Sequence, residues 1–224
     1  MSLIKGILFD LDGTLIESVE SIWRCADHVL RSEGLPGIDQ RTAERAMILK
    51  LDLFSASGSN LGTDQREMLF ERFLRCYPDF MKYSKIMPSA REVVEDAKSR
   101  KLRLALVTTE SRRSATEILR NFGLLEFFEV IVGFEDTKQH KPSAEPVLEA
   151  LSLMGLKPSE VLVVGDTELD AIAGKKAGAT TVIVTTGPTP IERIRSEKPD
   201  FIINGLCDLP DVIASVINGS MGKS

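Results

Sequence analysis

Short apolar runs recur along the chain and alternate with segments in which apolar residues return every three or four positions. The first run is Ile-Lys-Gly-Ile-Leu-Phe, residues 4–9, with a single charged side chain. Such runs are typical of strands buried on both faces of a parallel sheet. Similar runs follow at residues 102–107, 130–132, 161–164, 181–184 and, more weakly, 201–203.

Helical periodicity fills the intervals between the later runs. The segments are residues 90–98, 114–122, 144–154 and 168–177. Gly123 and Gly155 follow two of them and suit the left-handed conformation that ends many helices. Strands that alternate with helices in this way form right-handed crossovers. The pattern therefore predicts an α/β fold with a doubly wound parallel sheet.

Residues 17–85 interrupt this alternation, because they contain no strand-like run. Helical spacing appears at residues 16–30, 42–54 and 65–80, with a polar connection at 55–63. We expect hinge strands near residues 14–17 and 84–88, on either side of this stretch. The prediction is an α/β core domain of residues 1–16 plus 86–224, with an inserted all-helical domain of residues 17–85.

Composition narrows the class of protein. The chain has 224 residues, 43% of them hydrophobic, which is enough for a sizeable core, and its net charge of -5 does not favour nucleic acid. Cys25, Cys76 and Cys207 form no Cys-x-x-Cys pair, so neither disulfides nor a zinc site is expected. No apolar run is long enough to cross a membrane. We predict a cytoplasmic protein, monomer or weak homodimer, with no membrane or nucleic-acid partner.

Two aspartates stand directly after the first predicted strand, in the string Asp10-Leu11-Asp12-Gly13-Thr14. Open α/β sheets bind ligands at the carboxyl ends of their strands, and Gly13 lets the chain curl there. A carboxylate that attacks phosphorus forms an acyl phosphate, and a second, protonated carboxyl group gives its proton to the leaving alcohol. Asp10 suits the first role and Asp12 the second. The alternative for this string is an ordinary turn after a strand.

Polar residues also follow three later strands. They are Thr108 and Thr109 after the run at 102–107, Lys141 after that at 130–132, and Asp166 and Asp170 after that at 161–164. Taken singly, Thr108 and Asp166 suit helix caps, and Lys141 suits a solvated surface. However, all of them fall at one edge of the predicted sheet, so we expect a single crevice to contain them. The candidate phosphoryl-binding residues are Gly13, Thr14, Thr108, Thr109 and Lys141.

The candidate site carries an excess of negative charge. Its aspartates, Asp10, Asp12, Asp166 and Asp170, would repel one another unless a cation bound among them. Oxygen ligands and a phosphoryl partner favour Mg²⁺ as that cation. Lys141 would offset further negative charge on the transferring phosphoryl group. The expected partner is therefore a small phosphorylated metabolite.

These motifs resemble those of the haloacid dehalogenase superfamily, in particular its phosphoglycolate-phosphatase-like branch. The resemblance covers nearly the whole chain. It is carried by Phe9-Asp10-Leu11-Asp12-Gly13-Thr14-Leu15, Val107-Thr108, Lys141-Pro142, Val164-Gly165-Asp166-Thr167-Glu168-Leu169-Asp170 and the glycine- and alanine-containing run at 173–179.

The resemblance implies a role for each of these residues. Asp10 would be the nucleophile and Asp12 the general acid/base, while Thr108 and Lys141 would bind the phosphoryl group. Mg²⁺ would be held by the Asp10 side chain, the Asp12 carbonyl oxygen and Asp166, with Asp170 in the outer shell. The helical insertion resembles the family's mobile cap, which excludes water and selects the substrate.

The resemblance leaves the reaction partly open. A second aspartate at Asp12 favours a phosphatase or a mutase over a dehalogenase. Thr109 stands where the branch often has asparagine, and residues 46–53 depart from its glycine-containing cap segment, so phosphoglycolate is not assigned as the substrate. The leading hypothesis is Mg²⁺-dependent hydrolysis of a small phosphomonoester through an aspartyl-phosphate on Asp10. The alternatives are β-phosphoglucomutase-like phosphotransfer, pyrophosphate cleavage, and a catalytically silent module that binds a phosphorylated metabolite.

Overall fold

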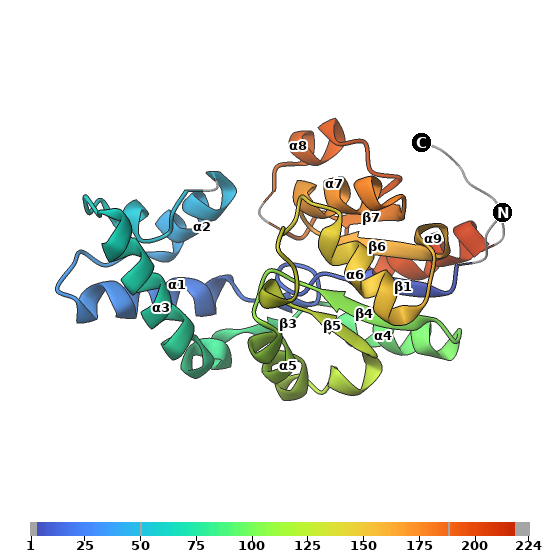
Figure 1. Ribbon diagram of the computed structural model, residues 1–224, viewed down its shortest axis with the longest axis horizontal. Helices are drawn as coiled ribbons and strands as arrows, with labels where there is room; N and C mark the ends of the chain where they lie inside the picture. Colours follow the sequence, from blue (N-terminus) through green and yellow to red (C-terminus); the bar gives the residue numbers. More distant parts are fainter. Residues whose placement is uncertain (1–3, 50, 188, 218–224) are drawn as a thin grey trace. The chain divides into compact units, whose positions relative to one another are not determined.

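The computed structural model describes residues 4–49, 51–187 and 189–217. The chain divides into two compact units, Met1–Ile16 with Ile86–Ser224, and Glu17–Lys85. The first is an α/β unit and the second is helical (Figure 1). No helix among the described residues is long and apolar enough to cross a membrane.

In the described part of the α/β unit, six parallel strands form one sheet in the order β5-β4-β1-β6-β7-β8. The strands are β1 Gly6–Phe9, β4 Arg103–Val107, β5 Val130–Val132, β6 Val161–Gly165, β7 Thr180–Val184 and β8 Phe201–Ile203. From the central β1 the chain builds outward to β5 and then returns to build β6 to β8 on the other side. Sheets of this topology bind ligands beyond the carboxyl ends of the strands, at the point where the order of the strands reverses.

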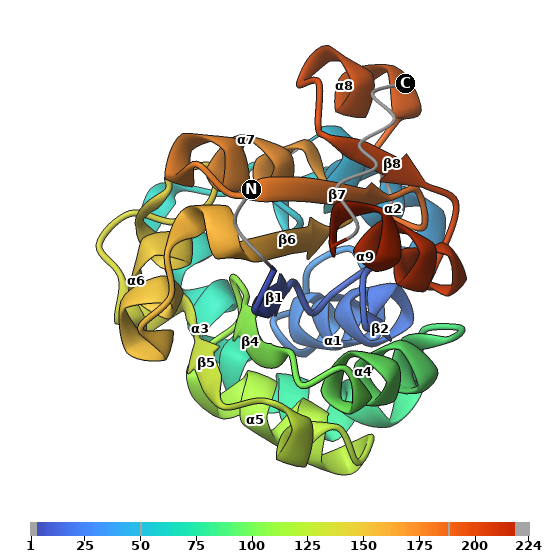
Figure 2. The ribbon, with the colours of Figure 1, turned by 90° about the vertical axis from the view of Figure 1, so that its right-hand side faces the viewer.

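Helices cover both faces of this sheet, as Figure 2 shows. They are α4 Ala90–Ser99, α5 Arg112–Asn121, α6 Glu145–Met154, α7 Glu168–Ala177, α8 Ile191–Ser196 and α9 Leu209–Ile217. On one face α6 and α7 pack on the apolar side chains of β1, β4 and β6. On the other, α4 and α9 pack against each other. The predicted doubly wound α/β fold is confirmed.

Some of the observed helix limits differ from the predicted ones. Helix α5 begins at Arg112, two residues before the predicted start, because the Ser111 hydroxyl accepts a hydrogen bond from the Ser114 N–H and caps the helix there. Gly123 and Gly155 adopt the left-handed conformation expected of them, with φ of 63° and 62°. Helices α8 and α9 were not predicted.

The helical unit contains α1 Val19–Ser32, α2 Gln40–Leu49 and α3 Thr63–Phe80. Its core includes the ring of Phe73, which stacks on Tyr77 and meets the edge of Phe54. The prediction that the second helix reaches residue 54 is wrong. That helix ends at Leu49, and a short 3-10 helix, Ser55–Ser57, follows. The chain passes between the two units through β2 Ile16–Glu17 and β3 Lys85–Ile86, which pair where hinge strands were expected.

Candidate active site

Asp10 lies at the carboxyl edge of the sheet, directly after β1. Its N–H donates to the Val164 carbonyl oxygen at 2.8 Å, which continues the pairing of β1 with β6. The ammonium group of Lys141 donates to Asp10 Oδ1 at 2.7 Å, to Asp170 Oδ1 at 2.6 Å and to the Val107 carbonyl oxygen at 3.1 Å. With only 6% of its side chain exposed, Lys141 is a buried counter-charge and not a solvated surface lysine.

The turn after β1 packs closely on Asp166, which is 1% exposed. The Thr14 hydroxyl donates to Asp166 Oδ1 at 3.2 Å. Gly13 has a φ of 79°, and a Cβ at this position would collide with Asp166 Oδ2. From the segment after β7, Gly187 approaches the same oxygen so closely that it too has no room for a Cβ. Gly13 and Gly187 therefore both pack directly against the Asp166 carboxylate.

Replacing Gly13 should test this packing. We expect Gly13→Ala to lower the free energy of unfolding by about 2 kcal/mol or more, since left-handed strain adds to the collision with Asp166. Gly155→Ala is the matched control, because Gly155 has a φ of 62° but no atom within 4 Å of an added Cβ. Strain alone predicts a loss of about 1 kcal/mol there. Denaturant unfolding in EDTA measures both variants, and equal losses would contradict the packing argument.

Asp170 joins Lys141 to the start of α7. Its Oδ1 accepts from Lys141, while its Oδ2 accepts from the N–H and the hydroxyl of Thr167 at 3.1 and 2.6 Å. Thr167 is therefore the N-cap residue of α7. Asp166, which the sequence also suggested for that position, does not cap the helix. Asp166 keeps its carboxylate at the site.

The remaining predicted residues differ in their surroundings. Asp12 is half-buried, and its charge acts on Asp10. Thr108 is buried, and its hydroxyl accepts a hydrogen bond from the Glu110 N–H at 3.1 Å. It does not cap α5, because Ser111 does so. Thr109 is exposed in the same turn.

Three residues near the site were missed from the sequence. Glu110 follows Thr108 by two positions, and burial and the charge of Asp10 raise the pKa of its carboxyl group. The same strand-end argument would have found it. Thr186, which donates to the Gly13 carbonyl oxygen at 2.8 Å, and Gly187 come after β7 and carry no comparable chemical signal.

Burial and the repulsion between neighbouring carboxylates are the main causes that raise pKa values at this site. Burial raises the pKa of Asp10 to about 7, and Lys141 only partly opposes this, while Asp170 and Asp12 add to it. Burial, followed by the charges of Asp10 and Asp170, also raises the pKa of Asp166 well above its usual value. Burial alone would lower the pKa of Lys141, but Asp10 and Asp170 raise it, so the ammonium form is favoured.

This arrangement fits a divalent cation. One carboxylate oxygen from each of Asp10, Asp166 and Asp170 lies within 4.8 Å of the others. Burial is the main cause of the raised pKa values of Asp10 and Asp166, and the neighbouring carboxylates add to it, so a further positive charge would stabilise their ionised forms. Ligands made only of oxygen suit Mg²⁺, so the residues present fit the ion that the sequence suggested.

A pH-dependent effect of Mg²⁺ on stability follows. The Asp10 pKa of about 7 in the folded state exceeds the ordinary 3.8, so its contribution to stability is full at low pH and is lost as the pH rises through about 7. Bound Mg²⁺ would offset the repulsion that remains at high pH. We expect MgCl₂ to raise the melting temperature, relative to EDTA, more at about pH 8 than at about pH 5. NaCl at matched ionic strength controls for screening. Equal shifts at both pH values would contradict this account.

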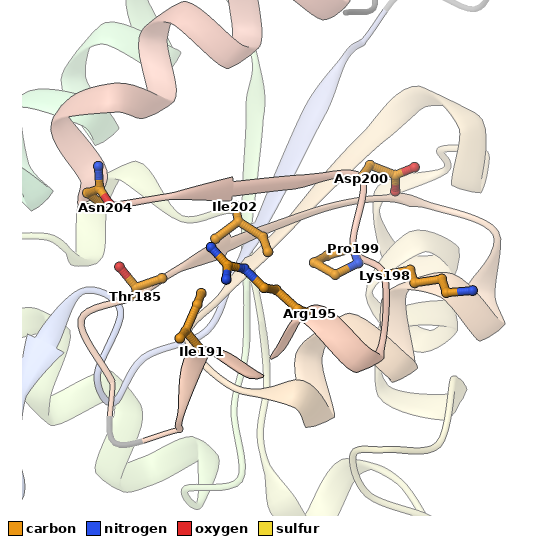
Figure 3. A pocket seen from close by; sticks show the side chains of 8 residues that line it. All are labelled: Thr185, Ile191, Arg195, Lys198, Pro199, Asp200, Ile202 and Asn204. Atoms are coloured by element: carbon orange, nitrogen blue, oxygen red, sulfur yellow. The ribbon is translucent and has the colours of Figure 1, made fainter. Parts of the chain in front are cut away.

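A separate cavity of about 600 Å³ lies along β8. Figure 3 shows the side chains that line it, among them Ile191 and Arg195 from α8, Ile202 from β8, and Thr185 and Asn204, which follow β7 and β8. No residue of the carboxylate cluster lines this cavity. The chemistry described above therefore lies elsewhere in the α/β unit.

Known proteins are similar to this chain in both sequence and fold. The family model described as haloacid dehalogenase-like hydrolase matches residues 7–184. The chain is 31% identical to pyrophosphatase PpaX of Halalkalibacterium halodurans, over 94% of this chain and 97% of the relative. It is 33% identical to phosphoglycolate phosphatase of Aquifex aeolicus, over 92% and 95% respectively.

A solved structure agrees with these matches. It is the crystal structure of a predicted phosphoglycolate phosphatase from Haemophilus somnus, which superposes with a TM-score of 0.84 at 26% identity and covers 95% of this chain and 99% of that one. The family match spans most of the chain, from within β1 to the end of β7, and it includes the polar residues that follow β1, β4, β5 and β6. The chain belongs to the haloacid dehalogenase-like hydrolase family.

Proposed function

We propose that this protein is a Mg²⁺-dependent phosphatase that hydrolyses a small phosphomonoester through an aspartyl-phosphate on Asp10. The observation that carries the proposal is the contact of Lys141 Nζ with Asp10 Oδ1 at 2.7 Å, inside a cluster that also contains Asp166 and Asp170. A buried carboxylate held by a buried cation at a strand end is suited to attack phosphorus. The names of the relatives, phosphoglycolate phosphatase and pyrophosphatase, support phosphoryl chemistry.

The proposed reaction has two steps. An Asp10 oxygen attacks phosphorus and forms an O–P bond, while the bond to the leaving oxygen breaks and Asp12 gives that oxygen a proton. Asp12 then takes a proton from water, which attacks phosphorus and releases Asp10 and orthophosphate. Lys141, which contacts Asp10, and the buried Thr108 hydroxyl would steady the phosphoryl oxygens as charge develops on them.

Asp10, Asp166 and the Asp12 carbonyl oxygen are the residues proposed to hold Mg²⁺, with Asp170 behind them. When bound, the ion would shield the negative nucleophile from the negative substrate and polarise the phosphoryl group. Asp170 has both carboxylate oxygens engaged, one by Lys141 and one by Thr167. Its proposed part is therefore to hold Lys141 in place.

We further propose that the helical unit Glu17–Lys85 acts as a cap. Both of its connections run through the short strands β2 and β3, and β2 begins two residues after Thr14. A cap so connected can exclude water from the intermediate and add contacts to the substrate.

The direct test is release of orthophosphate from an aryl phosphate such as p-nitrophenyl phosphate, with Mg²⁺ and with EDTA. The proposal expects release that depends on Mg²⁺. Pyrophosphate belongs in the same panel, because one relative is named a pyrophosphatase. An isomeric phosphate ester without net release of orthophosphate would indicate a mutase instead. Binding of Mg²⁺ and ligand without any turnover would indicate a silent binding module.

A further inference from the structure

We propose that Glu168 is a positioning residue for the magnesium site. Through its contacts with Thr189 and Arg193 it holds the chain that follows β7 against Asp166, and it thereby fixes the orientation of that carboxylate. The inference rests on the proposed function, because it takes Asp166 as a ligand of Mg²⁺. Glu168 itself is neither a proposed ligand of the ion nor a participant in the two chemical steps.

Glu168 is a buried carboxylate at the start of α7, two residues after Asp166. Only 7% of its side chain is exposed. Its Oε1 accepts a hydrogen bond from the Arg193 guanidinium group, and its Oε2 accepts one from the Thr189 hydroxyl at 3.1 Å. Burial of a carboxylate is costly unless such donors surround it, so Glu168 favours a structure in which both residues stay near it. It therefore fastens α8 to the start of α7, which lies beside it (Figure 1).

The same stretch of chain is fastened a second time, close to the end of β7. There the Thr186 hydroxyl donates to the Gly13 carbonyl oxygen at 2.8 Å. Gly187 follows directly, and it lies so close to Asp166 that a Cβ at Gly187 would collide with the carboxylate. Gly187 is thus held against Asp166 between two attachments, one made by Thr186 and the other made by Glu168.

The contacts around Asp166 restrict how its carboxylate can turn. Its Oδ1 accepts from the Thr14 hydroxyl at 3.2 Å, and its Oδ2 is bounded by Gly13 and Gly187. A ligand held in this way does not have to be ordered when the metal ion binds. If the attachment at Glu168 were lost, Gly187 would be free to move away, and Mg²⁺ would have to order the carboxylate at a cost in affinity.

Charge alone offers a different explanation, and the ion pair with Arg193 separates the two. As a carboxylate close in the chain to Asp166, Glu168 would attract Mg²⁺ even if it positioned nothing. On that explanation, removal of Arg193 should strengthen the binding of Mg²⁺, because a positive charge is lost. Positioning predicts the opposite, since the attachment of the chain is weakened whichever partner of the ion pair is removed.

The test is calorimetric titration of MgCl₂ into the metal-free protein at about pH 8. We expect Glu168→Gln and Arg193→Gln each to raise the Kd for Mg²⁺ roughly tenfold, as is usual for groups that orient metal ligands. Gly187→Ala, which disturbs the same contact without a change of charge, should raise the Kd at least as much. The Arg193 side chain is 41% exposed, so its replacement should keep the fold, and the test does not depend on Glu168→Gln alone.

Glu160→Gln and Arg103→Gln are the matched controls. Each breaks an ion pair, with Lys5 and Glu129 respectively, at the amino ends of β6 and β4, which form the opposite edge of the sheet. Neither should change the Kd for Mg²⁺ by more than about twofold. Phosphate release gives a second readout. In Glu168→Gln the Mg²⁺ concentration for half-maximal rate should rise roughly tenfold, while kcat at saturating Mg²⁺ stays within about threefold of the wild type.

The possible results separate this inference from the proposed function. A Kd that is unchanged in Glu168→Gln and Arg193→Gln, whether or not these variants lose stability in denaturant, would overturn the inference, as would tighter binding in Arg193→Gln. If the wild type binds Mg²⁺ but releases no phosphate, the proposed function fails, and the Kd values still decide the role of Glu168. If the wild type binds no Mg²⁺, both fail.

Discussion

Asp10→Asn should abolish phosphate release, with kcat at least about 1000-fold below the wild type. An amide is isosteric with the carboxylate and can still accept a hydrogen bond from Lys141, but it cannot act as the nucleophile. The fold should not suffer, because the Asp10 charge is opposed by its burial and by Asp170. We therefore expect the melting temperature in EDTA at about pH 8 to be no lower than that of the wild type.

Lost activity with kept stability would show that Asp10 has a chemical and not a structural role. Asp211→Asn is the matched control, since Asp211 is an exposed aspartate on α9 of the same unit, and it should leave kcat unchanged. Steady-state release of orthophosphate and thermal unfolding provide the two readouts. An Asp10→Asn protein that keeps more than about a tenth of the wild-type kcat would remove Asp10 from the proposed role.

Lys141→Met should reduce both activity and stability. We expect kcat/KM to fall by about 100- to 1000-fold, because the phosphoryl group loses its fixed cation. The free energy of unfolding at about pH 8 in EDTA should fall by about 3 kcal/mol, since Asp10 and Asp170 lose the counter-charge that is 6% exposed between them.

The loss of stability should also depend on pH. With Lys141 gone, the two carboxylates bind protons more readily, so the destabilisation should shrink as the pH is lowered towards about 5. Lys138→Met, an exposed lysine in the same segment, controls for loss of a positive charge and should change neither quantity appreciably. A destabilisation that is equal at both pH values would show that packing of the side chain, and not its charge, is what matters.

The sequence predicted the sheet well because its strands are buried on both faces. Residues 130–132 and 201–203 were predicted with the limits that the structure has, and the apolar run before Asp10 became β1. Helices α8 and α9 were missed. Helix α8 has only six residues. Helix α9 is a short and largely apolar segment, which cannot be told from a buried strand by its pattern alone.

The site was predictable to the extent that it depends on strand ends. Asp10, Lys141 and Asp166 follow parallel strands, and such ends meet at one edge of a sheet. Contacts between loops could not be predicted in this way. The close approach of Gly187 to Asp166 depends on the path of the chain after β7, and no local pattern encodes that path. Glu110 was not predicted because a glutamate in a turn is, by its residue type alone, most often a solvated surface residue.

The account as a whole depends on a covalent bond between Asp10 and the phosphoryl group, and trapping that bond tests it most directly. Protein quenched in acid during turnover with Mg²⁺ and an aryl phosphate should carry one phosphoryl group, which mass spectrometry of its peptides should locate on Asp10. Asp12→Asn, which lacks the proposed base, should retain the group longer. Turnover that proceeds with Asp10 unmodified in both proteins, or with the phosphoryl group on another residue, would contradict the account.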